Sequence, residues 1–438
     1  MIYSIFAVFL ILYFLAYLFQ RSFIAPLSLL LLSFLMAVAL IIINVNDWDV
    51  HINPEFVPYI FMAVASFSAG CLLVSFFSRA GAPHGKVSTK DYQRIALSEH
   101  YPATMLLVIS GICTMVYIFM MLRNVGFSGG VRATLRAIYD EAVKRNNGGF
   151  ILHQMHEIVI AIAEINFFQI LSNKYLKKRR TSAVKLFVPV MFFAICMIVS
   201  TDRNIFIRFV LYCLCMWVLF YTYTSKKTRQ KTNWRILKKA LLYAVIMLLL
   251  FYALGKLKNY TSNFSRMVGI YGGSGLYNFN LFIGEFDGSN LAHGNSTFSE
   301  LQNTLKALGL LGGNIDVKPI GDEFIVYRTS TGYVYASNIY SAMRVYVEDF
   351  GFAGVIIFPM FLGIVFEVLY KRTKNQRFGF SWILYSMMIY SIVYFTVLEQ
   401  FFKRFHLGMV YEIGWVFLLY ILIYGRINLR FKSVTISG

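Results

Sequence analysis

Charged side chains are scarce in this sequence. Only 14% of its 438 residues are Asp, Glu, Lys or Arg, whereas 58% are hydrophobic and 17% are aromatic. A soluble domain carries about 25% charged residues, so a chain with this composition must bury much of its apolar surface in lipid. The composition therefore predicts a polytopic integral membrane protein, and the length of its apolar runs predicts that the fold is all-α.

Several motifs that would assign a chemistry are also missing. The sequence has no Walker A motif, no Rossmann glycine pattern and no His-Glu-x-x-His motif. Its five cysteines lie in apolar stretches without metal-ligand spacing, which is typical of packing residues. No basic segment or small-residue cleavage site accompanies the first apolar stretch, so we expect a retained helix. We predict no metal and no cofactor, and any reaction must draw its energy from a gradient or from an activated substrate.

Apolar stretches of membrane-spanning length recur along the chain. A hydrocarbon core needs roughly 20 apolar residues per helix. By that measure we predict about eleven spans, at 2–19, 24–44, 56–78, 101–122, 150–172, 186–200, 205–224, 240–255, 350–370, 378–400 and 408–425. We expect transmembrane helices 1–8 in residues 1–255, a large extracytoplasmic loop with short helices in 256–349, and helices 9–11 with a basic tail in 350–438.

Acidic residues are also few, and the basic excess is unevenly distributed. The sequence holds 21 Asp and Glu against 41 Lys and Arg, a formal net charge of +20. One alternating set of predicted loops is rich in Lys and Arg and contains only the acids Asp91 and Glu99, whereas the other set is nearly balanced. Because basic loops stay in the cytoplasm, we predict that the N-terminus is outside and the C-terminus inside. The positive charge is then an orientation signal and does not require a nucleic-acid partner.

The large loop ends in the segment Ser337–Gly351, which leads directly into the ninth predicted span. If this segment is helical, Tyr340, Arg344 and Glu348 recur every fourth residue and share one face. A phenol, a guanidinium and a carboxylate would then meet at a membrane surface. The planar fork of Arg344 suits an anion, and Glu348 or Asp349 is placed to act as a general base.

Further arginines map to the same predicted outer side. Arg203 lies in a tight turn between the sixth and seventh spans, Arg208 follows inside the membrane, and Arg404 lies between the last two spans. Because charges inside a bilayer are costly, they usually face a cavity or a partner. These arginines point to an anion site, with interface anchoring, or a pair between Arg203 and Asp202, as the alternatives.

The fifth predicted span is unusually polar. His153 and Glu157 lie one turn apart on one face, which predicts a proton relay or a substrate cavity, with an interhelical hydrogen-bond network as the alternative. In the large loop, Arg328 lies among tyrosines that would pack on sugars or belong to an aromatic belt. Asp47-Trp48-Asp49, in the first outer loop, matches the short metal motif of some membrane glycosyltransferases.

The segment from Ser337 to Gly354 resembles the bacterial oligosaccharide repeat-unit polymerases, the Wzy-type O-antigen and capsule polymerases. That family typically shows a Tyr-x-x-x-Arg…Glu-Asp-x-Gly pattern before a late span. The matching residues are Tyr340, Arg344, Glu348, Asp349, Gly351 and Gly354. The turn Ser200-Thr-Asp-Arg203 is similar to the Gly-Ser-Arg turn of the family but lacks its glycine.

The resemblance implies a metal-independent glycosyltransferase of the bacterial cytoplasmic membrane. It would transfer a growing glycan from undecaprenyl pyrophosphate to a lipid-linked oligosaccharide repeat unit on the outer face, among membrane lipid, with a chain-length regulator and a flippase as partners. Arg203 and Arg344 would stabilise the pyrophosphate, and Glu348 or Asp349 would activate the acceptor hydroxyl. Contacts to the substrate would come from Tyr340, Arg328, Arg208, Arg404, His153 and Glu157.

Three other functions remain open. A flippase or transporter of lipid-linked oligosaccharides usually has short loops and internal repeats, whereas this sequence has a long loop and no evident repeat. An O-antigen ligase uses related chemistry with a different acceptor. A metal-dependent sugar transferase would use Asp47 and Asp49.

Overall fold

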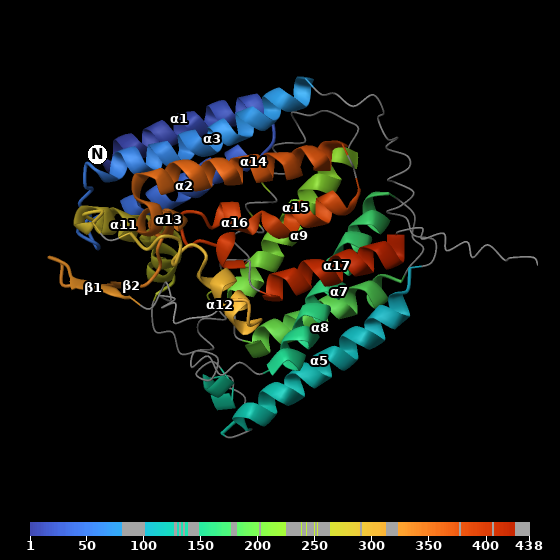
Figure 1. Ribbon diagram of the computed structural model, residues 1–438. Coiled ribbons are helices and arrows are strands. Elements are labelled where there is room, and N and C mark those ends of the chain that lie inside the picture. The colour runs from blue at the N-terminus through green and yellow to red at the C-terminus, as the bar shows by residue number, and fades with distance from the viewer. Residues whose placement is uncertain are drawn as a thin grey trace, which may run out of the picture.

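Helices form most of the computed structural model, as Figure 1 shows. The structure describes residues 1–80, 101–126, 149–176, 182–200, 203–224, 263–289, 291–311, 323–375, 378–404 and 407–424, with a few single positions and short runs between 129 and 138 and between 238 and 252. Within these residues the strands are β1 (Ile325–Arg328) and β2 (Val334–Ser337), which form one antiparallel hairpin. The predicted all-α class is therefore correct apart from this hairpin, and most of the predicted span 240–255 lies outside the described residues.

Among the described residues, eight helical segments are long and apolar enough to cross a membrane. They are α1 (Ile2–Gln20), α2 (Pro26–Ile43), α3 (Phe56–Ala80), α5 (Ala103–Val125), α7 (Gly149–Tyr175), α8 (Ala183–Ser200), α9 (Arg203–Thr224), and α13 (Ala342–Phe350) continued by η1 (Gly351–Ala353) and α14 (Gly354–Asn375). The helix α17 (Leu407–Tyr424) is also apolar, but its apolar segment, Gly408–Tyr424, is shorter than these eight. The polytopic helical architecture is confirmed, whereas the predicted count of about eleven spans is not.

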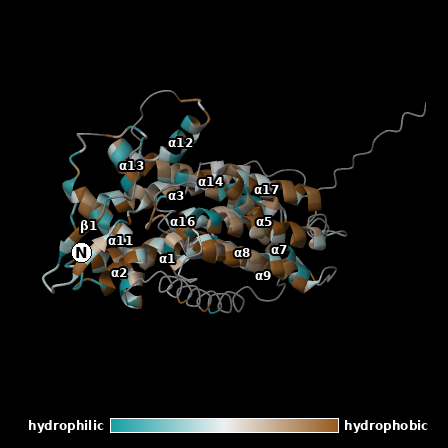
Figure 2. Cartoon of the chain, turned by 90° about the horizontal axis from the view of Figure 1, so that it is seen from below, coloured by the Kyte–Doolittle hydropathy of each residue, from teal (hydrophilic) through white to brown (hydrophobic). Residues whose placement is uncertain are grey.

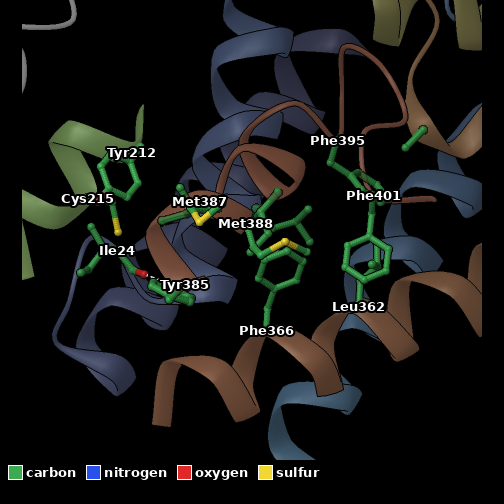
Figure 3. Close-up of a cluster of buried hydrophobic side chains, with 14 of the residues drawn as sticks. Ile24, Tyr212, Cys215, Leu362, Phe366, Tyr385, Met387, Met388, Phe395 and Phe401 are labelled. Carbon is green, nitrogen blue, oxygen red and sulfur yellow. Dashed lines mark hydrogen bonds between the residues drawn. The ribbon is translucent and has the colours of Figure 1, made fainter. Parts of the chain in front are cut away.

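The predicted tenth span, 378–400, is not one helix. It consists of α15 (Phe380–Met388) and α16 (Tyr390–Val393), followed by irregular backbone up to the turn η2 (Phe402–Arg404). Figure 3 shows Met387, Phe395 and Phe401 of this region in a buried cluster that also includes Tyr212 of α9 and Phe366 of α14. Non-helical backbone inside a membrane protein persists only where protein groups surround it and satisfy it, and here that condition is met.

The predicted large loop, 256–349, contains a long helix that the sequence did not indicate. α11 (Phe264–Glu285) packs against α2 and is followed by the short helix α12 (Ser299–Ala307). Close packing requires its glycines: a Cβ at Gly275 would lie 2.6 Å from the carbonyl oxygen of Thr396. The N–H of Ser341 donates to the carbonyl of Gly275 at 3.0 Å. This region is therefore a packed layer that positions the start of α13, and not a loop with short helices alone.

The two ends of the helical bundle differ. The N-terminus, α11, α13 and the β1–β2 hairpin lie at the left end in Figure 1, which is the hairpin end of the bundle, and α3 and α14 finish at the opposite end. η2 contacts α12, and the ring of Phe402 in η2 packs on that of Tyr346 in α13, so η2 lies beside α13. Figure 2 shows hydrophilic residues on α12 and α13 and hydrophobic residues along the long helices.

Helices α3 and α14 approach closely because each presents a glycine to the backbone of the other. A Cβ at Gly70 would lie 2.2 Å from the carbonyl oxygen of Met360, and a Cβ at Gly363 would lie 2.2 Å from that of Phe67. Small residues are the usual means by which membrane helices pack tightly. The Sγ of Cys71 also donates to the carbonyl of Gly363 at 3.5 Å. Since α14 continues from α13, the packing of α3 against α14 also helps to hold α13 in place.

We expect Gly363→Ala to lower the free energy of unfolding by about 1–3 kcal/mol, because the added methyl group would force the two backbones apart. Equilibrium unfolding in mixed detergent micelles, followed by circular dichroism, measures the change. Gly414→Ala in α17 is the matched control, because a Cβ there meets nothing within 4 Å. Equal stabilities of the two variants would contradict the role of Gly363 in packing.

Candidate functional site

Arg344 lies in the first turn of α13, and only 9% of the residue is exposed. Its guanidinium carbon lies 3.7 Å from the centroid of the Tyr340 ring and 5.1 Å from that of Phe282. Its Nη2 donates to Oε2 of Glu323 at 2.6 Å. Two aromatic rings stabilise a cation that has lost most of its water. The guanidinium is thus held in one place at the hairpin end.

The predicted grouping of Tyr340, Arg344 and Glu348 is present, although not on one helical face. Because α13 begins at Ala342, Tyr340 precedes the helix. Its ring nevertheless lies over Arg344, and its hydroxyl donates to the carbonyl of Glu323 at 3.0 Å. Glu348 is half-buried one turn after Arg344, close enough for the two charges to attract each other. These residues form the α13 site, which comprises Tyr340, Arg344, Glu348 and Glu323.

Asp349 serves the backbone and is fully buried. Its Oδ1 accepts the N–H of Ser296 at 3.0 Å, and its Oδ2 accepts the N–H of Thr297 at 2.5 Å. Its carbonyl accepts the N–H of His293 at 3.2 Å. Both carboxylate oxygens are therefore used to hold the segment before α12 against α13. Of the two carboxylates predicted as a base, Glu348 is the one that is partly exposed.

Asp349→Asn replaces one acceptor oxygen with an amide NH₂ that faces a backbone N–H. We expect this change to lower the free energy of unfolding by about 1–3 kcal/mol, because a buried donor loses its acceptor. Thermal unfolding of the purified protein measures the effect, and Asp287→Asn, at an exposed aspartate that binds only Ser289, is the control. An Asp349→Asn variant of normal stability that has lost activity would instead assign Asp349 to the chemistry.

A second buried carboxylate, Glu399, supports α13 from the other side. Its Oε1 accepts the N–H groups of Phe401 and Phe402 at 2.8 and 2.9 Å, and its Oε2 accepts that of Lys403 at 2.8 Å. The hydroxyl of Tyr346, on α13, donates to Oε1 at 3.3 Å. Glu399 thus links the irregular segment before η2 to α13.

The β1–β2 hairpin is attached to the loop between α2 and α3. The carboxylate of Asp49 accepts the backbone N–H and the hydroxyl of Ser330, and these two bonds lower its pKa. The hydroxyl of Tyr327 donates to the carbonyl of Trp48 at 2.7 Å. Asp49 is therefore used to hold the hairpin, and no group of three or more metal-binding side chains occurs among the described residues. Arg328 is exposed at the end of β1.

Ionisable side chains from three helices meet and form the inner charge cluster, which comprises Arg208, Glu412, Glu157, His153 and His156. Glu412, Glu157 and His156 are buried, whereas the side chain of His153 is 49% exposed. Arg208 Nη1 lies 3.0 Å from Oε2 of Glu412, whose side chain is 2% exposed. Oε1 of Glu157 lies 3.8 Å from His153 Nε2 and 3.9 Å from His156 Nδ1. Arg208 also attracts Glu157. The sequence predicted Arg208, His153 and Glu157 as substrate contacts, and the structure adds Glu412 and His156 to this group.

Two predicted arginines are placed only by their backbone. Arg203 is the first residue of α9, and Arg404 is the last residue of η2. The two positions lie near the starts of α9 and α17, and these starts are close together because Arg208, in α9, pairs with Glu412, in α17. The side chains of Arg203 and Arg404 lie outside what the structure describes, and their contacts with substrate stay a prediction.

The candidate residues thus fall into two groups. The α13 site lies beside α11 and α14, whereas the inner charge cluster lies among α7, α9 and α17, on the other side of the molecule in Figure 1. No protein-family model matches the chain, and no curated protein and no solved structure is significantly similar to it. The function is therefore argued from the chemistry of these two groups.

Proposed function

We propose that this chain is a metal-independent membrane glycosyltransferase of the repeat-unit polymerase type. It would transfer a growing glycan from undecaprenyl pyrophosphate to a lipid-linked oligosaccharide repeat unit at the outer face of the cytoplasmic membrane. The observation that carries the proposal is the α13 site, where a fixed, nearly buried guanidinium lies one turn from a half-buried carboxylate. The site lies at an end of the bundle, where a lipid headgroup would meet it.

Each group has a role in such a transfer. As the bond between the anomeric carbon and the pyrophosphate oxygen breaks, negative charge grows on the leaving group, and the Arg344 guanidinium stabilises that charge. As the acceptor hydroxyl oxygen bonds to the anomeric carbon, Glu348 accepts the hydroxyl proton. The fixed position of Arg344 between Tyr340 and Phe282 favours catalysis, because little reorganisation is needed during the reaction.

Arg344→Lys keeps the charge but loses the planar fork, and Glu348→Gln removes the base. We expect each variant to lower the polymerisation rate by roughly 10²-fold or more, so that long polysaccharide is lost. Polysaccharide length on gels from cells that depend on this chain, with protein level measured in parallel, is the readout. Glu285→Gln, at an exposed acid that ends α11, is the matched control. Normal chain length in both site variants would remove these roles.

The inner charge cluster favours a second candidate, a transporter of lipid-linked oligosaccharides. Ionisable side chains inside a membrane bundle often mark an ion or proton pathway, and Glu412, Glu157 and His156 are all buried. Each of these residues lies within about two to three turns of the start of its helix. Movement of an oligosaccharide across the membrane without elongation would favour this function over polymerisation.

A further inference from the structure

The guanidinium of Arg344 uses only part of its donor edge. Nε and Nη2 lie on the same edge of the guanidinium plane, and together they form the fork that receives two oxygens of one anion. Nη2 is occupied by Oε2 of Glu323 at 2.6 Å. Nε is buried and has no acceptor among the residues that the structure describes. Buried polar groups in folded proteins are nearly always hydrogen-bonded. The unpaired Nε therefore indicates that the Nε–Nη2 edge of Arg344 receives an acceptor with two oxygens.

Glu323 is not a fixed partner of Arg344. Its side chain is 76% exposed, whereas that of Arg344 is 11% exposed. Exposed carboxylates that pair with a cation contribute little to stability, because water competes for them. The carboxylate of Glu323 is free to move into solvent while its backbone stays, since the carbonyl of Glu323 remains bonded to the Tyr340 hydroxyl.

We propose that Glu323 is a displaceable occupant of an anion site on Arg344, and that the ligand which replaces it is a diphosphate or phosphate group. Two oxygens on one phosphorus would accept from Nε and Nη2 at once, which the single oxygen of Glu323 does not do. The negative charge of Glu323 would leave as the charge of the ligand enters, so Arg344 would be neutralised both with and without ligand. This inference deepens the proposed function, on which it rests for the identity of the lipid.

Competition within the chain has a measurable consequence. While Glu323 occupies Arg344, only a fraction of the molecules is open to an external anion, and the apparent affinity is lowered by that fraction. Removing the charge of Glu323 should therefore strengthen anion binding, because the anion no longer competes with a carboxylate for Arg344. A residue that only held the fold together would not give a gain in affinity.

The test is the binding of inorganic pyrophosphate to the full chain in lipid nanodiscs, measured by isothermal titration calorimetry. We expect Glu323→Gln to bind about fivefold more tightly than the wild type, which corresponds to the weak strength of an exposed ion pair. We expect Arg344→Lys to bind at least about tenfold more weakly, and Glu285→Gln, at an exposed acid that is not paired with Arg344, to bind as the wild type does. Unchanged or weaker binding by Glu323→Gln, in a variant with a wild-type circular dichroism spectrum, would overturn the proposal.

Two further titrations identify the source of the anion. If the ligand is a lipid headgroup, undecaprenyl pyrophosphate in the nanodisc should compete with inorganic pyrophosphate for Arg344. If the ligand is a free anion, inorganic phosphate should compete and undecaprenyl pyrophosphate should not. Because binding is measured without turnover, this experiment tests the anion site independently of the polymerase function. A gain in affinity by Glu323→Gln in a protein that makes no polymer would support the anion site and reject the polymerase.

Discussion

Two buried carboxylates satisfy the backbone N–H groups of irregular segments beside α13, and the hairpin end depends on this constraint. Asp349 accepts the N–H groups of Ser296 and Thr297, and Glu399 accepts those of residues 401–403. Such segments cannot rely on water inside a membrane protein. Because Glu399 also binds Tyr346, α13 is fixed from two sides. The same short helix carries Arg344 and Glu348, so structural acids hold the groups that we assign to chemistry.

The fold was predictable wherever a single physical property decides it. Long apolar runs insert into lipid as helices whatever their partners, so helices such as α2 and α7 followed from composition. α11 did not, because its glycines and polar residues hide the apolar face. The need for the glycines is visible only in the folded chain, where a Cβ at Gly272 would collide with Leu40 of α2 and one at Gly275 with Thr396. The break in 378–400 was also hidden, because the sequence there is mostly apolar and contains no proline. The contacts of Glu399 that hold the following turn form only in the folded chain.

The site was predictable only where its residues are neighbours in sequence. The spacing of Tyr340, Arg344 and Glu348 placed them together, and the structure brings them together. Spacing could not distinguish Glu348 from Asp349, because their different roles come from the backbone that each meets after folding. The contact of Glu323 with Arg344 and that of Arg208 with Glu412 join distant segments, so only the tertiary structure reveals them.

The central claim is that the α13 site joins one lipid-linked glycan to another. Its most direct test is the purified full chain in liposomes with lipid-linked oligosaccharide repeat units as the only substrate, in the presence of EDTA and without nucleotide. The glycans are then released and separated by length. We expect a ladder of longer chains from the wild type and none from Arg344→Lys. Repeat units that cross the membrane but stay at their original length would contradict the claim.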